Sequence, residues 1–175
     1  KYSIGDTKEI DLGTEGKHLM EIVALDTDDL ADGSGKAKIT WLSKTLLNTS
    51  HRMNPPRSGT SDAYDEGTGT IGGWDKCEMK TYLNTTIANL LPSDIRSNVK
   101  TVTKYTRIYN TAGSEVNDVV TEETFWLASC REMLGAITNA ETQGPTYSET
   151  FPDNASRVKS KVGAYGISWW WLRSA

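Results

Sequence analysis

The sequence has few cysteines, histidines and phenylalanines, the residues that form disulfides, bind metals and fill apolar cores in small domains. Its 175 residues include only two of each. Two cysteines are too few for a disulfide-stapled scaffold, so the fold must rest on apolar packing. No apolar run approaches the roughly 18 residues that a membrane-spanning helix needs. We therefore expect one domain over residues 1–175 that does not insert into a membrane.

The chain also lacks an excess of positive charge. It carries 19 Lys and Arg against 23 Asp and Glu, which gives a formal net charge of -4. General binding to nucleic acid needs a basic surface. We therefore expect no nucleic-acid partner.

Sequence patterns of known catalytic and cofactor sites are missing as well. The chain has no G-x-S-x-G, P-loop or dinucleotide-binding fingerprint. His18, His51, Cys77 and Cys130 lie apart, without the spacing of a transition-metal site. We expect no catalytic residue, no bound metal and no cofactor. The cysteines are interpreted as buried small side chains, and whether they pair stays open.

Four aspartates fall within residues 26–32 and offer oxygen ligands that calcium would accept. Leu30 and Ala31 stand where an EF-hand needs ligands, so that spacing fails. A solvated polar turn is the favoured interpretation, and calcium binding stays open.

What the chain has in abundance is Thr and Ser, 22 and 15 residues, together with 6 Trp and 7 Tyr. Thr and aromatic residues suit pleated, half-buried sheets. Long polar stretches occupy residues 48–73 and 138–168. We expect an α+β fold of small antiparallel sheets, two or three short helices and long irregular loops. The patterns predict strands near residues 10–12, 19–25, 36–42, 99–108, 125–128 and 169–172, and helices over 74–84, from Pro92, and over 130–137.

Helix signals are strongest in two places. Asp75 lies in the first turn of the first predicted helix, and Asn84 is a plausible C-terminal cap. Ser129 precedes the last predicted helix, and Glu132 follows three residues later, as in a capping box. We also predict that seven residues are mostly buried in one cluster: Trp41, Trp74, Tyr82, Leu83, Trp126, Leu127 and Trp170.

Three consecutive tryptophans, residues 169–171, are the most distinctive feature. On a strand, Trp169 and Trp171 share one face. Burial on both faces is the favoured interpretation. The alternative is a ligand-binding surface formed by Trp169 and Trp171 with Tyr147 and Tyr165, because flat rings stack on sugars and anchor protein partners.

One ion pair is predicted from the same region. If strand 125–128 lies beside strand 169–172, the first turn of the following helix meets Arg173. The guanidinium fork fits one carboxylate, so we predict that Glu132 pairs with Arg173 in a structural role.

Eight landmarks in order resemble a bacterial family known as a domain of unknown function, number 6273. They are Ile4-Gly5-Asp6, AKITW at 37–41, GGW at 72–74, YLN at 82–84, LPSDI at 91–95, VTKYT at 102–106, WLAS at 126–129 with Glu132, and WWLRS at 170–174. The resemblance implies a C-type-lectin-like or formylglycine-generating-enzyme-like architecture. It also implies that the domain continues after residue 174 into a hairpin and a closing strand.

The same resemblance implies a place in bacterial secreted or cell-surface proteins. With no catalytic motif, we expect a non-enzymatic module that binds a glycan or a protein on long loops. Two alternatives stay open. One is an enzyme of unknown type on the formylglycine-generating-like scaffold, although no cysteine follows Cys130. The other is a structural spacer domain.

Overall fold

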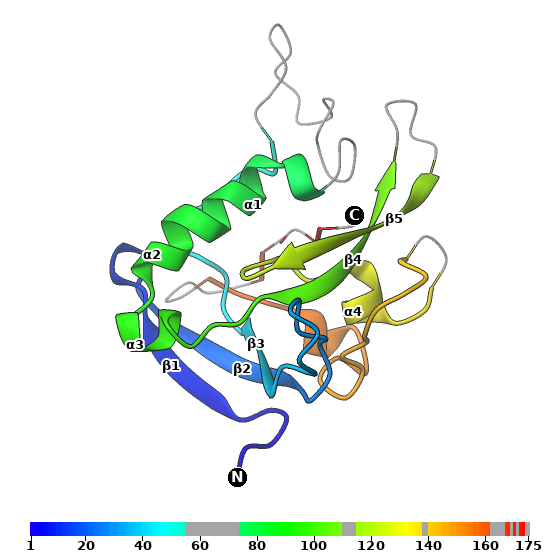
Figure 1. Ribbon diagram of the computed structural model, residues 1–175. Coiled ribbons are helices and arrows are strands. Elements are labelled where there is room, and N and C mark those ends of the chain that lie inside the picture. The colour runs from blue at the N-terminus through cyan, green and yellow to red at the C-terminus, as the bar shows by residue number, and fades with distance from the viewer. Residues whose placement is uncertain are drawn as a thin grey trace, which may run out of the picture.

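The computed structural model describes residues 1–54, 74–109, 115–137, 140–161, 167–168, 170 and 172–173, with the side chains of 109 and 115–117 excepted. It shows two small antiparallel sheets and several short helices (Figure 1), which is the predicted α+β class. The strands are β1 (Thr7–Asp11), β2 (Lys17–Leu25), β3 (Ile39–Ser43), β4 (Val102–Tyr109) and β5 (Glu115–Glu123). The α-helices are α1 (Glu78–Tyr82), α2 (Ala88–Leu90), α3 (Ser93–Arg96) and α4 (Cys130–Leu134).

The first sheet has the order β1-β2-β3, with β2 paired antiparallel to both neighbours. A short 3-10 turn, Gly13–Glu15, joins β1 to β2. β2 alternates exposed and buried residues and then becomes buried at Ile22, Val23 and Ala24, where the pairing with β3 contains a bulge. Within the described residues, β3 is an edge strand of this sheet.

A 3-10 turn (Trp74–Lys76) follows, and after Cys77, whose backbone is extended, one continuous helical run leads from α1 through a π-helical turn (Leu83–Ile87) into α2. The predicted C-terminal cap at Asn84 is therefore wrong. The Asn84 amide instead donates to the carbonyls of Lys80 and Phe125 and accepts from Phe125 N, so it ties the helix to a distant loop. The predicted helix at Pro92 exists as α3, which begins at Ser93.

Helix α4 begins as the sequence indicates. Ser129 Oγ accepts from Glu132 N, and Glu132 Oε2 accepts from Ser129 N, so the predicted capping box is formed. The helix ends at Leu134 rather than near Ile137. Gly135 has φ of 79°, a left-handed conformation that ends helices and favours glycine.

One predicted strand is absent, one lies partly outside the described residues, and one observed strand was not expected. Residues 126–129 are irregular, because side chains take the place of a ladder: Arg173 Nη1 donates to Leu127 O at 2.7 Å. Residues 170 and 172 are irregular as well, and they are the only described part of the predicted strand 169–172. β5, which pairs with β4, was missed because its EVNDVVTEE sequence is rich in acids.

The core is divided into two clusters rather than the single one predicted. The first contains Val23, Ala24, Ala128, Met133, Tyr147 and Phe151, with Leu42, Trp170 and Leu172 packed against it. The second contains Met53, Trp74, Cys77, Met79, Leu83 and Ile87, with Tyr82, Trp126 and Leu127 among its partners. Trp170 thus belongs to the first cluster, and Trp41 belongs to neither. Of the seven residues predicted to be mostly buried, Trp74 and Leu83 are buried, and the other five are half-buried.

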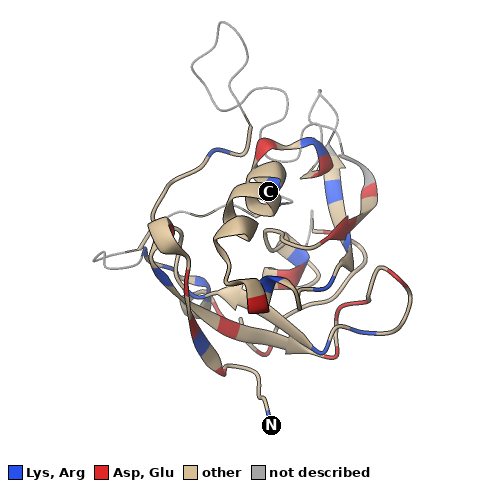
Figure 2. Cartoon of the chain, turned by 60° about the vertical axis from the view of Figure 1, so that its left-hand side comes forward, with Lys and Arg blue, Asp and Glu red and all other residues tan. Residues whose placement is uncertain are grey.

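Charges of both signs are interspersed along the ribbon rather than gathered by sign (Figure 2). None of the described helices has the length and apolar character needed to cross a bilayer.

Candidate functional site

A large groove separates the two hydrophobic clusters. Its volume is about 1490 Å³, and mostly apolar side chains line it. Val23, Leu42 and Trp170 contribute from the first cluster, and Met79, Leu83, Ile87 and Trp126 from the second. All five residues of β3 also line it, so we call it the β3 groove. It exceeds the range of about 300–1,000 Å³ that is common for small-molecule sites.

The edge of β3 on which no other described strand pairs borders this groove. Lys44 N donates to Leu19 O, and the register places Ser43 opposite Met20 and Trp41 opposite Ile22. Opposed residues of an antiparallel pair alternate between bonded and non-bonded positions. Trp41 and Ser43 therefore direct their backbone N–H and C=O groups away from β2, toward the edge on which another strand can pair.

This edge is closed at one end. Just after β3, Leu46 N donates to Ser160 O at 2.8 Å, and Leu46 forms a parallel bridge with Lys161. The segment around residues 159–161 therefore takes the position of a neighbouring strand beyond Ser43. An extended chain that pairs with β3 has to stop or turn away there.

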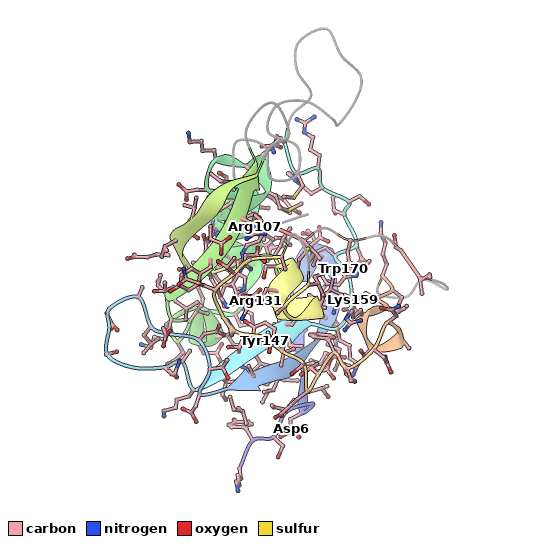
Figure 3. All side chains as sticks on the ribbon, turned by 90° about the vertical axis from the view of Figure 1, so that its right-hand side faces the viewer. Asp6, Arg107, Arg131, Tyr147, Lys159 and Trp170 are labelled. Atoms are coloured by element: carbon pink, nitrogen blue, oxygen red, sulfur yellow. The ribbon has the colours of Figure 1, made fainter. Side chains whose placement is uncertain are left out.

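Lys159 lies at the closed end. Its side chain lines the groove, only 7% of the residue is exposed, and Nζ donates to Ser43 O at 2.6 Å. Nζ lies 5.4 Å from the ring centroid of Trp170 and 6.0 Å from that of Phe151, and Figure 3 shows Lys159 beside Trp170. Burial lowers the pKa of Lys159 to about 8, with Glu21 opposing and Lys44 assisting the shift.

A second constellation is a closed set of charges, which we call the ion cluster: Asp28, Lys104, Glu132, Arg173 and the Tyr147 hydroxyl. Lys104 Nζ lies 2.6 Å from Asp28 Oδ1, 2.8 Å from Glu132 Oε1 and 2.8 Å from Tyr147 Oη. Arg173 donates two hydrogen bonds to the Glu132 carboxylate, from Nη1 to Oε2 at 2.7 Å and from Nη2 to Oε1 at 3.1 Å. Thr40 Oγ1 also donates to Asp28.

Each member of the ion cluster is at most 3% exposed. Burial alone would raise the pKa of Glu132, but the charges of Arg173 and Lys104 lower it to about 2. The pKa of Tyr147 lies well above its ordinary value, because of burial and the nearby carboxylates of Glu132 and Asp28. Two cations therefore balance two anions, and the phenol stays neutral.

The ion cluster touches the groove through one aromatic ring. Lys104 Nζ lies 4.4 Å from the ring centroid of Trp126, and Trp126 lines the groove. Tyr147 lines it too, while its hydroxyl bonds inward to Asp28. The charged groups themselves are almost fully buried, so the ion cluster suits a rigid wall of the groove rather than acid–base chemistry on a ligand.

Of the residues predicted from sequence to bind a ligand, Tyr165, Trp169 and Trp171 lie outside the described residues. Tyr147 is 3% exposed, so its ring is core and not a surface platform. Glu132 and Arg173 are in contact, as the sequence argument placed them, with Nη1 2.7 Å from Oε2.

The aspartates of residues 26–32 do not converge on one point. Asp26 pairs with Lys38, Asp29 pairs with Lys36, and Asp28 turns inward to the ion cluster. In the part of the chain that the structure describes, no three His, Cys, Asp or Glu side chains gather as a metal site requires. Cys77 is a buried free thiol, so the conceivable Cys77–Cys130 disulfide is not formed.

Sequence reasoning missed Lys104 and Lys159, and its interpretation of residues 26–32 as a solvated turn is wrong for Asp28, which is buried beside Lys104. Lys104 had a detectable signal, because it shares one face of β4 with Val102 and Thr106, and all three are buried. An alternating strand with a lysine on its apolar face calls for a buried acid. Lys159 lies in a polar stretch with no periodicity, and no sequence signal marks it.

Comparison with known families gives one match. The family model described as Domain of unknown function (DUF6273) matches residues 40–175. A search of curated proteins and a search of solved structures found no match.

Proposed function

This chain belongs to the DUF6273 family, and we propose that it is a non-enzymatic module that binds an extended segment of a protein partner. The segment lies in the β3 groove and pairs with the edge of β3. The observation that carries this proposal is an apolar groove between two core clusters, bordered by a strand edge on which no other described strand pairs.

Main-chain pairing with an exposed edge is a common mode of peptide recognition, in which backbone bonds give affinity and pockets for alternate side chains give specificity. Both parts have a counterpart here, because the N–H and C=O of Trp41 and the N–H of Ser43 face this edge where the apolar lining begins, while Ser43 O accepts from Lys159 Nζ. Unprotected edges invite aggregation, so a strand edge left open by the described residues beside an apolar hollow favours a dedicated partner.

Of the two ligand classes expected from sequence, the groove favours protein over glycan. A sugar carries many hydroxyl groups, and each needs a hydrogen-bonding partner when it leaves water. The lining is mostly apolar, and the Tyr147 ring is buried instead of forming a platform. A C-type-lectin-like architecture and a place in a bacterial secreted or cell-surface protein remain part of the proposal.

The test uses a synthetic library of short peptides with alternating apolar residues, with binding measured by fluorescence polarisation. The tightest peptide is then N-methylated at one residue at a time. Strand pairing predicts loss of binding at every second position, because alternate N–H groups face β3. Equal effects at all positions, or no binder at all with the folded chain, would contradict the proposal.

Ile39→Asp puts a charge in the lining and should weaken the tightest peptide about tenfold or more. Val120→Asp is the matched control. Val120 is 58% exposed on β5 and is not among the groove residues, so this variant should bind normally. Equal behaviour of the two variants would place the peptide elsewhere.

A further inference from the structure

Lys159 differs from the other buried basic side chains that the structure describes. Lys104, Arg107 and Arg173 each contact a carboxylate. Lys159 is 7% exposed, yet no carboxylate oxygen of a described residue lies within 4.0 Å of its Nζ. A buried cation without an anion is unfavourable, so this position needs an explanation.

The amine of Lys159, a residue that lines the groove, has unused hydrogen-bonding capacity. An ammonium group has three donors, and among the described residues Nζ donates one bond, to Ser43 O. The rings of Phe151 and Trp170 contact the cation and cannot accept a charge as a carboxylate does. Because Lys159 lines the β3 groove, its free donors are within reach of whatever lies there.

The position of Lys159 along β3 indicates which kind of peptide carboxylate it can bind. Lys159 Nζ donates a hydrogen bond to the outward-facing carbonyl of Ser43, and residues 160 and 161 pair with the chain just after β3. A peptide that runs along β3 toward Ser43 therefore has no edge left on which to continue. Its last residue comes to lie beside the ammonium group.

We propose that Lys159 binds the C-terminal carboxylate of the peptide held in the β3 groove, so that the module recognises free C-terminal tails that run parallel to β3. This inference rests on the proposed function, since it names the end of the segment that the groove holds. Bonds from a charged donor to a carboxylate are among the strongest in proteins, and here they form away from bulk water.

The protonation state fits this role. With a pKa of about 8, Lys159 is mostly charged at neutral pH, although burial opposes the charge. The charged groups that influence it are Glu21 on β2 and Lys44 after β3, which pair with each other at 2.7 Å. A bound carboxylate supplies the countercharge that this pair does not.

The test compares the tightest peptide of the library as a free acid and as its C-terminal amide. The free acid should bind wild-type chain about tenfold tighter or more, as expected for hydrogen bonds between charged groups. In Lys159→Met the acid and the amide should bind equally, and in the control Lys17→Met the difference should persist. Lys17 is an exposed residue of β2 that pairs with Glu9 and does not line the groove.

Equal binding of acid and amide to wild-type chain overturns the role of Lys159 while strand pairing along β3 stands. This outcome needs no variant, so it holds even if Lys159→Met fails to fold. An amide ending in Glu that binds as tightly as the free acid also overturns it, because a side-chain carboxylate would then suffice. If no peptide binds, the proposed function and this inference both fail.

Discussion

Two lysines are buried in this chain, and their surroundings are opposite. Lys104 is fully buried and contacts two carboxylates, a phenol hydroxyl and the face of Trp126. Lys159 is nearly as buried, but its contacts are one backbone carbonyl and two aromatic rings. The first lysine is satisfied within the domain, and the second is not.

The difference separates structural charges from charges kept for recognition. The ion cluster joins residues far apart in sequence: Asp28 after β2, Lys104 on β4, Glu132 on α4, Tyr147 and Arg173. Removing any member leaves an uncompensated charge or a buried polar group, so the cluster fixes how these segments meet. Lys159 contributes little to how the segments pack, because its hydrogen-bond partner is the Ser43 carbonyl, which would otherwise face the groove.

The strongest test of this contrast is Lys104→Met. It leaves Asp28 and Glu132 as buried anions with Arg173, which bonds Glu132, as the remaining cation of the ion cluster, and it should lower the free energy of unfolding by about 3–5 kcal/mol. Lys38→Met is the matched control. The Lys38 side chain is 85% exposed and pairs with Asp26, so its loss should change stability by less than about 1 kcal/mol. Urea melts of both variants measure this, and similar losses would remove the distinction between buried and surface pairs.

Glu132→Ala should cost about 3 kcal/mol at neutral pH, because Arg173 loses both of its charged bonds. The loss should depend on pH. The pKa of Glu132 is about 2 in the folded chain and 4.5 ordinarily, so its contribution is present above pH 4.5 and is lost as the pH falls toward 2. Melts from pH 7 to 2 should show the gap to wild type narrowing. A stable variant that loses only peptide binding would give Glu132 a binding role instead.

The sequence shows one contact of the ion cluster, Glu132 with Arg173, and little of the β3 groove. The Glu132–Arg173 contact could be inferred because both residues stand beside recognisable elements, a capping box and an aromatic run. Its premise of two adjacent strands was wrong, since Leu127 and Ala128 bond to Arg173 without forming a ladder. The groove and Lys159 depend on how the two core clusters sit apart. No local sequence pattern specifies the separation of the two clusters. The sequence therefore predicts one core that contains apolar residues of both clusters.

Lys159→Met should stabilise the chain, by about 1–3 kcal/mol at neutral pH, since it removes an unpaired buried charge. The folded pKa of about 8 lies below the ordinary 10.5, so the unfolded chain holds the proton more tightly. The penalty is complete below pH 8, shrinks as the pH rises from 8 to 10.5, and vanishes above that. The advantage of the variant over wild type should follow this course in melts. A destabilised variant would make Lys159 a structural residue like Lys104.

The smallest effect should come from Ser129→Ala, which tests whether the ion cluster depends on its charges or on the cap that orients them. The substitution removes one bond, from Glu132 N to Ser129 Oγ, and keeps the bond from residue 129 N to Glu132 Oε2. Loss of an N-cap side chain costs about 1 kcal/mol. Arg173 and Lys104 still hold the Glu132 carboxylate from two directions, so the acid-induced loss of stability between pH 4.5 and 2 should keep its wild-type form. If Ser129→Ala instead abolishes that pH dependence, the cap positions the carboxylate, and the ion pairs are its consequence.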